Sequence, residues 1–211
     1  RLHHQSLTDS LKVIQVFSLF CFLGMCYFAY QNALQTLYIS IPFVLLTVLY
    51  AVPFLSGFDK NLREVSYLKV VVVAIVWAGF TVLIPVIDSD SEITFQVYLL
   101  LLQRFLIVVV LILPFDIRDV KYDSISLQTI PRKIGFEKTK RLGLILMVFC
   151  LILEYLASTT STMQTPFMLF FFLVILLLMR AKKDQSQYYS SFWVESLPVV
   201  WWLIHLGFHN F

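Results

Sequence analysis

Charged residues are scarce in this sequence, and their scarcity excludes a soluble globular protein. Only 14% of the 211 residues are charged, 59% are hydrophobic, and the mean hydropathy is +0.83. A soluble domain carries about 25% charged residues. The chain could not cover its own surface with polar groups, so lipid must be its solvent.

Bridging or metal-binding cysteines are also lacking. Cys21, Cys26 and Cys150 lie inside apolar runs, where a thiol acts as a small hydrophobe. No CxxC or Cys/His metal pattern exists. The first ten residues, RLHHQSLTDS, are polar, so no cleavable signal peptide is visible. The sequence shows no internal repeat and no low-complexity linker, and we expect residues 1–211 to form a single transmembrane helical domain.

The sequence does contain long apolar runs. A helix that crosses a membrane needs about 20 mostly apolar residues. We therefore predict an all-α, multi-span transmembrane helix bundle with seven spans. They cover residues 11–31, 36–55, 67–87, 94–115, 141–158, 166–180 and 190–208.

Positive charge lies on one side of these predicted spans. Of the 16 Lys and Arg residues, only Arg104 lies deep in a span. The other 15 (16 minus 1) fall in the connections that follow even-numbered spans or at the N-terminal edge. Cytoplasmic loops are the ones enriched in Lys and Arg. We expect an integral protein of a bacterial inner membrane, with the N-terminus and the 116–141 loop in the cytoplasm and the C-terminus outside.

A few polar residues interrupt the predicted spans. Arg104 lies about 18 Å along its helix from Asp116, at 1.5 Å per residue. A charge at this depth usually faces a bundle interior. Arg104 either helps to position a substrate or pairs with Glu154 or Glu195 as a structural link. We expect Glu154, near the outer end of its span, and His205 to reach water.

Three aspartates follow the fourth predicted span, in the stretch PFDIRDVKYD. Asp116, Asp119 and Asp123 are spaced at i, i+3 and i+7, so a continued helix places them on one face. Crowded carboxylates repel one another, and Mg²⁺ relieves this because it binds one or two carboxylates together with substrate phosphate oxygens. Arg118 and Lys121, between the aspartates, suit phosphate as well. The alternative is that a helix emerging into water simply becomes polar.

The residues around these aspartates resemble a motif of the UbiA-type intramembrane prenyltransferases. That family's second aspartate motif, DxxDxxxD after a transmembrane helix, is followed by a Thr-Leu-Pro-like triplet, a glycine and a basic helix start. The stretch LYAVPF at 49–54 is similar to the family's Leu-Tyr-Ser/Thr-Pro stretch. The residues that match the aspartate motif are Asp116, Asp119 and Asp123, then Thr129, Ile130 and Pro131, Gly135, and the basic run from Lys138 to Arg141.

The resemblance implies a nine-helix fold, of which the seven predicted spans are the last seven. The family's first motif, NDxxDxxxD, is absent, and its expected place is before residue 1, together with two helices. We expect a fragment of the family fold, or else a degenerate relative. Either would hold half of the metal site and have little or no catalytic activity of its own.

The function implied by the resemblance is Mg²⁺-dependent transfer of a prenyl group. The donor is a prenyl diphosphate, and the acceptor is an aromatic or other lipophilic molecule in the lipid bilayer. Asp116 and Asp119 are the expected catalytic residues, and Asp123 joins them as a metal ligand. The expected diphosphate-binding cations are Lys60, Arg63, Lys69, Arg118 and Lys121.

Other classes of membrane protein fit the sequence less well. A seven-helix receptor would have its N-terminus outside, and a retinal protein needs a lysine within 190–208, where none stands. A phosphatidyl-alcohol transferase needs a glycine after Asp119, where Val120 stands. A non-enzymatic multi-span protein such as a transporter component is the alternative, and no nucleic-acid partner is expected.

Overall fold

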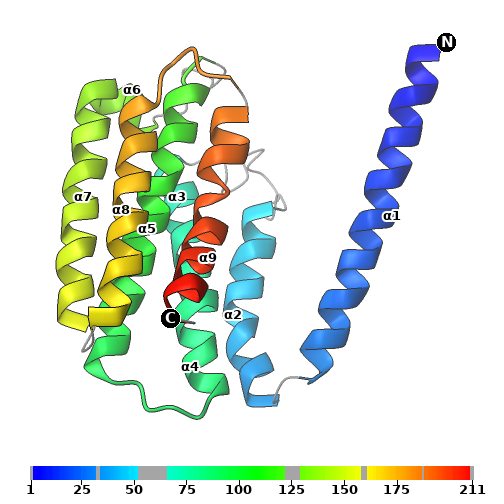
Figure 1. The fold of residues 1–211 in the computed structure, drawn as a ribbon. Coiled ribbons are helices and arrows are strands. Elements are labelled where there is room, and N and C mark those ends of the chain that lie inside the picture. The colour runs from blue at the N-terminus through cyan, green and yellow to red at the C-terminus, as the bar shows by residue number, and fades with distance from the viewer. Residues whose placement is uncertain are drawn as a thin grey trace. The chain divides into compact units, whose positions relative to one another are not determined.

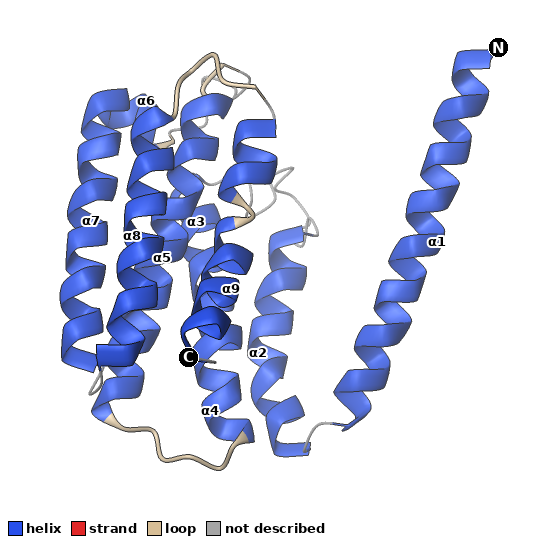
Figure 2. Cartoon of the chain, in the orientation of Figure 1, coloured by secondary structure: helices blue, strands red, loops and turns tan. Residues whose placement is uncertain are grey.

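Helices make up every regular element that the structure, a computed structural model, describes (Figure 1, Figure 2). The chain consists of two compact units, Arg1–Ile41 and Pro42–Phe211. The described residues are 2–31, 34–51, 66–121, 129–157, 161–186 and 188–209.

The first unit contains α1, Leu2–Gln31, and the first turns of α2, Leu34–Ala51. The segment Lys12–Gln31 of α1 is apolar and 20 residues long, which is enough to cross a membrane. The helix extends back to Leu2, beyond the predicted span, because helical backbone hydrogen bonds do not require apolar side chains.

The second unit contains the remainder of α2 and all later elements. Two of them, η2 and η3, are π-helical turns. The elements are α3 (Ser66–Ala78), η2 (Gly79–Leu83), α4 (Ile84–Asp88), α5 (Phe95–Asp119), α6 (Ile130–Ile134), α7 (Phe136–Ala157), α8 (Ser161–Arg180), η3 (Tyr189–Val194) and α9 (Leu197–His209).

Pro85 accounts for the π-helical turn η2. A proline inside a helix lacks an N–H, and its ring clashes with the carbonyl four residues earlier. The wider turn, closed by a hydrogen bond from the Ile84 N–H to the Gly79 carbonyl, relieves that clash. Gly79 also gives room to the ring of Phe43, because an added Cβ would lie 2.3 Å from Phe43 Cε1.

Helix α5 is the centre of the second unit, in contact with α3, α7 and α8. Its buried residues Val110 and Leu113 join Met147 and Cys150 of α7 and Phe170 of α8 in one apolar cluster. This packing fixes the rotation of α5 about its axis. The rotation in turn decides which polar side chains of α5 face its neighbours.

The second unit has a basic end and an acidic end (Figure 1). Residues 116–121, 129–135 and 180–186 lie at the basic end, whereas the connection 88–94 lies at the other. Among the described Lys and Arg residues of this unit, Arg104 alone lies far from the basic end. The separation matches the alternation of basic and acidic connections along the sequence.

Each of the seven predicted spans is helical over most of its described residues, the exceptions being Thr94 and the turn at Glu195 and Ser196. Within those residues, three helices are long and apolar enough to cross a membrane: Lys12–Gln31, Leu68–Asp88 and Phe95–Asp119. Leu34–Tyr50 and Thr165–Arg180 are shorter apolar helices. The chain is therefore all-helical where described, with several helices of membrane-spanning length, as an integral membrane protein requires.

Candidate functional site

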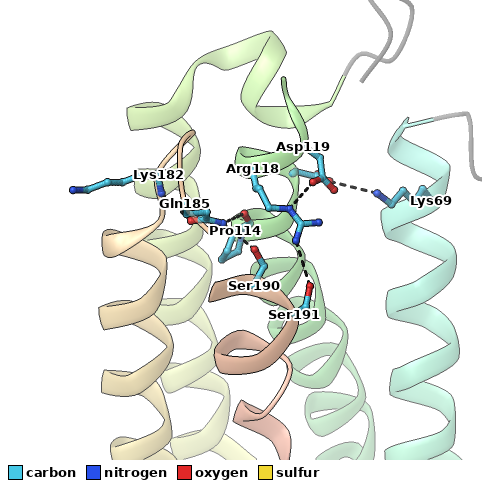
Figure 3. A network of polar contacts seen from close by, with 9 residues as sticks. Lys69, Pro114, Arg118, Asp119, Lys182, Gln185, Ser190 and Ser191 are labelled. Atoms are coloured by element: carbon cyan, nitrogen blue, oxygen red, sulfur yellow. Dashed lines mark hydrogen bonds and ion pairs between the residues drawn. The ribbon is translucent and has the colours of Figure 1, made fainter. Parts of the chain in front are cut away.

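An ion pair joins α3 to α5 at the basic end of the second unit. Lys69 Nζ lies 3.7 Å from Asp116 Oδ1, and Figure 3 shows Lys69 reaching from α3 towards the end of α5. The Asp116 side chain is only 3% exposed, whereas that of Lys69 is 29% exposed. A buried carboxylate needs a partner of this kind, since removing it from water is costly.

Arg118 lies at the centre of a second set of contacts. Its Nε donates a hydrogen bond of 2.6 Å to Asp119 Oδ1, and its terminal nitrogen donates one of 3.3 Å to Ser191 Oγ of η3 (Figure 3). The guanidinium also lies 5.6 Å from the centre of the Phe115 ring. Arg118 therefore ties α5 to the last helical segment and presents a cation beside a partly exposed carboxylate.

Gln185 holds the connection between α8 and η3 against α5. Its Nε2 donates hydrogen bonds of 2.9 Å to the Pro114 carbonyl and of 2.9 Å to Ser190 Oγ, while its Oε1 accepts one from the backbone N–H of Lys182 (Figure 3). No feature of the sequence marks Gln185 for this role, because the role depends on a loop that folds back over a distant helix.

The structure brings five of the eight predicted site residues to this one end. Lys121 forms an ion pair with Asp184, which was not predicted from the sequence. Among the described residues, no group of three or more His, Cys, Asp and Glu side chains is placed to hold a metal ion, so the three-aspartate site stays a prediction. The five are Lys69, Asp116, Arg118, Asp119 and Lys121, while Lys60, Arg63 and Asp123 lie outside the described residues.

Thr129, in the triplet that carries part of the resemblance, is buried just before α6. Its Oγ1 has no hydrogen-bond partner within the described part of the chain. Buried hydroxyl groups are normally satisfied. The Thr129 hydroxyl is therefore a buried polar group at the basic end, and a ligand could supply its missing hydrogen-bond partner.

A cavity of about 530 Å³ lies within the second unit. Its walls come from α3, η2, α5, α7, α8 and α9, and they include Trp77, Trp201 and Trp202. On α5, the residues that line the cavity include Arg104 and Leu111. At 100° per residue, that face of α5 continues towards Phe115, Arg118 and Asp119. The face that lines the cavity therefore ends at the basic end in a cation and a carboxylate.

A buried polar network stands in the wall of this cavity. Gln103 Nε2 donates hydrogen bonds of 2.7 Å to Glu154 Oε2 and of 3.1 Å to the Cys150 carbonyl. Gln103 Oε1 accepts one of 3.2 Å from Arg104, whose Cζ lies 3.9 Å from the centre of the Trp201 ring. Arg104 thus reaches Glu154 through Gln103, an intermediary that the sequence reasoning missed.

One expectation about polar residues in the spans was wrong. Glu154 does not reach water, because it is 6% exposed and holds the amide of Gln103. His205 lines the cavity. The signal that could have found Gln103 is its place beside Arg104 in an otherwise apolar helix, since a second buried polar group next to a charge is a natural partner for it.

Comparison with known proteins finds no match. No family model, no curated protein and no solved structure matches the chain. The likeness to the UbiA-type enzymes therefore rests on the residues of the chain alone.

Proposed function

We propose that this chain is an intramembrane prenyltransferase, or the larger part of one. Its seven helical segments would cross the membrane with the basic end in the cytoplasm. It would move a prenyl group from a prenyl diphosphate to an aromatic or other lipophilic acceptor. The observation that carries the proposal is the face of α5 that lines an aromatic cavity and ends in Arg118 and Asp119.

The residues at the basic end have the chemistry to hold the diphosphate group. Carboxylate oxygens suit Mg²⁺, which needs only one or two protein carboxylates when phosphate oxygens complete its shell. Asp119, which is partly exposed, and Asp116 would supply them, with Asp123 as a third. Bound Mg²⁺ neutralises negative charge on the leaving diphosphate. Lys69 would leave Asp116 to contact a phosphate oxygen.

The cavity has the apolar lining to hold the prenyl chain. The bond between the allylic carbon and the diphosphate oxygen breaks, and its electron pair leaves with the diphosphate. The acceptor then forms a bond to that carbon and loses a proton. Aromatic rings such as those of Trp77 and Trp201 would pack against the apolar chain, while the reacting carbon stays beside the diphosphate at the basic end.

Binding of farnesyl diphosphate to the full chain in lipid nanodiscs tests the proposal. We expect binding that requires Mg²⁺ and that weakens roughly ten- to a hundredfold in Asp119→Asn, because one charge-assisted contact is lost. Glu137→Gln is the matched control, since Glu137 is an exposed carboxylate at the same end. Equal Mg²⁺-dependent binding by Asp119→Asn and the parent would refute the role of Asp119.

One observation favours a transporter component instead. Arg104, Glu154 and His205 all line a cavity among apolar helices, and ionisable residues inside a membrane often mark a substrate or proton path. Proteoliposomes that carry a proton gradient discriminate the two functions. A proton flux that Arg104→Gln abolishes and Asp119→Asn leaves unchanged would favour transport.

A further inference from the structure

We propose that the outer face of α7 is a binding site for an anionic phospholipid of the surrounding bilayer. Lys138 and Arg141 would contact the phosphate of the headgroup, and the apolar residues that follow them would contact an acyl chain. The site is separate from the cavity and from the proposed diphosphate site. It requires that α7 crosses the membrane, but it requires neither Mg²⁺ nor prenyl transfer.

The outer face of α7 exposes apolar side chains in helical order. The helix lies at the edge of the second unit and packs on α5 and α8, with Gly143 and Met147 buried (Figure 1). Ile145, Ile152 and Leu156 are 64%, 50% and 64% exposed. Their spacing of i, i+7 and i+11 places them on one side of the helix. Exposed apolar faces of this kind mark contact with a membrane or with a partner, and the low charge content of the chain favours lipid.

This apolar face ends at the basic end in two cations. Arg141 lies one turn before Ile145, and Lys138 lies three residues before Arg141, so both cations lie on the same side of α7 as the apolar residues. Both side chains are exposed, and neither forms an ion pair with a described residue. The outer face of α7 is therefore apolar along its length and cationic at one end.

The carboxylates nearby in the sequence are engaged with other cations. Residues 129–141 and 180–186 contain eight Lys and Arg residues but only two carboxylates. Glu137 lies 3.8 Å from Lys140, and Asp184 pairs with Lys121 of α5. Lys140 also donates a hydrogen bond of 3.1 Å to the Met179 carbonyl, which directs it to α8 and away from the outer face. The two outer cations thus have no carboxylate partner among the described residues, and an anionic headgroup would supply one.

The spacing along α7 matches the depth of one leaflet. The hydrocarbon core of a bilayer is about 30 Å thick, so one acyl chain covers about 15 Å of depth. That depth corresponds to about ten residues of a helix. A phospholipid whose phosphate contacts Arg141 would lay its chain along Ile145 and Val148 and end near Ile152, and all three of these apolar side chains are exposed.

An anionic phospholipid fits this face better than a zwitterionic one. The guanidinium fork of Arg141 matches two oxygens of a phosphate, and Lys138 adds a second positive charge. A choline or ethanolamine headgroup carries its own cation beside the phosphate, and the two side chains would repel it. Clusters of Lys and Arg at the end of a membrane-spanning helix attract anionic lipids for this reason.

Helix α8, next to α7, ends in the same way. Its exposed residues Phe172 and Leu176 lie on one side of the helix, and the exposed Arg180 follows them at the basic end. Recurrence on a second helix indicates that the basic end as a whole lies at the level of the lipid headgroups.

Quenching of a fluorophore by labelled lipids tests the proposal. An NBD group is attached in the Ile145→Cys variant of the full chain, from which the natural cysteines have been removed, in phosphatidylcholine vesicles without Mg²⁺. The probes are phosphatidylglycerol and phosphatidylcholine, each with a quenching nitroxide near the top of one acyl chain. We expect half-maximal quenching by labelled phosphatidylglycerol at a mole fraction roughly five- to thirtyfold lower, since each nearby Lys or Arg contributes about fivefold.

A second position for the fluorophore is the matched control within the same helix. Leu156 lies on the same exposed face but at the end of α7 that carries no cation. The Leu156→Cys variant should be quenched equally by the two lipids. Equal quenching by the two lipids at position 145, or the same preference at both positions, would overturn the proposal without any change to Lys138 or Arg141.

Removal of the two cations tests their role directly. The double variant Lys138→Gln with Arg141→Gln should lose the preference for phosphatidylglycerol at position 145, and glutamine preserves the helix. Lys12→Gln removes an exposed cation of α1, in the other compact unit, and should leave the preference unchanged. A preference that survives in the double variant, or an equal loss in Lys12→Gln, would refute a specific site on α7. Asp119→Asn should not alter the preference, so failure of the diphosphate site and failure of this site are told apart.

Discussion

Lys69 and Asp116 are ion-paired across α3 and α5, with Nζ 3.7 Å from Oδ1, and the carboxylate is almost fully buried. The first aspartate of the motif is therefore not a solvated group at a helix end. Asp116 makes a structural contact between α3 and α5 and is also a candidate metal ligand. A diphosphate that recruits Lys69 must replace this contact with others of similar strength.

Loss of Lys69 should destabilise the basic end of the second unit. Lys69→Met removes one charged partner from a buried carboxylate, which costs about 1–3 kcal/mol. Denaturation of the full chain in mixed micelles measures the change. Lys183→Met, which removes an exposed cation near the same end, should shift the free energy of unfolding by far less. Equal effects of the two variants would show that the Lys69–Asp116 pair contributes no stability.

Gly79 should tolerate no side chain while Phe43 is present. In Gly79→Ala, the added Cβ would lie 2.3 Å from Phe43 Cε1, so the ring or the helix must move. Overpacking of this kind costs about 1–3 kcal/mol. Gly207→Ala is the control, because nothing lies within 4 Å of a Cβ there and alanine favours a helix.

The substitution Phe43→Leu, combined with Gly79→Ala, tests whether the Phe43 ring causes this loss of stability. A smaller side chain at 43 should recover much of the stability that Gly79→Ala loses, as thermal unfolding in detergent would reveal. No recovery would mean that the cost of Gly79→Ala comes from the π-helical turn and not from the ring.

The helices could be predicted well from the sequence, because the thickness of a membrane sets the length of an apolar run and so the length of the helix that this run forms. The predicted span 94–115 corresponds to α5, Phe95–Asp119. Helix α7 begins at Phe136, five residues before the predicted span, because its first turns are charged and hydropathy does not detect them. The grouping of Arg118 with Asp119 also followed from the sequence.

Side-chain partners across helices could not be predicted in the same way. Gln103 and Glu154 are 51 residues apart, and their contact depends on how α5 and α7 are rotated. That rotation is set by packing of apolar side chains, which one sequence does not reveal. A pair of Arg104 with Glu154 was one of the alternatives expected from the sequence, and the structure places Gln103 between the two residues.

Sidedness in the membrane can be measured with two exposed positions at opposite ends of the second unit. Lys183 lies at the basic end and Ser91 at the acidic end. In a chain without its natural cysteines, we expect the Lys183→Cys variant to react with an impermeant maleimide only from the cytoplasmic side. The Ser91→Cys variant should react only from the other side. The reverse pattern would invert the proposed topology, and labelling of both from one side would exclude a spanning arrangement of the helices between them.

The contact between Gln103 and Glu154 should show strong coupling in a double-mutant cycle. Gln103→Leu removes the amide donor from a buried carboxylate, and Glu154→Leu removes one of the two acceptors of a buried amide. Each single change should cost about 1–3 kcal/mol, with the larger loss for Gln103→Leu because a charged acceptor then loses one of its donors. The double change replaces both partners by apolar side chains and should cost less than the sum of the two single changes. Reversible unfolding in mixed micelles gives all four free energies. Additive losses, with no interaction term, would mean that the 2.7 Å contact contributes nothing and that each residue acts through its own packing.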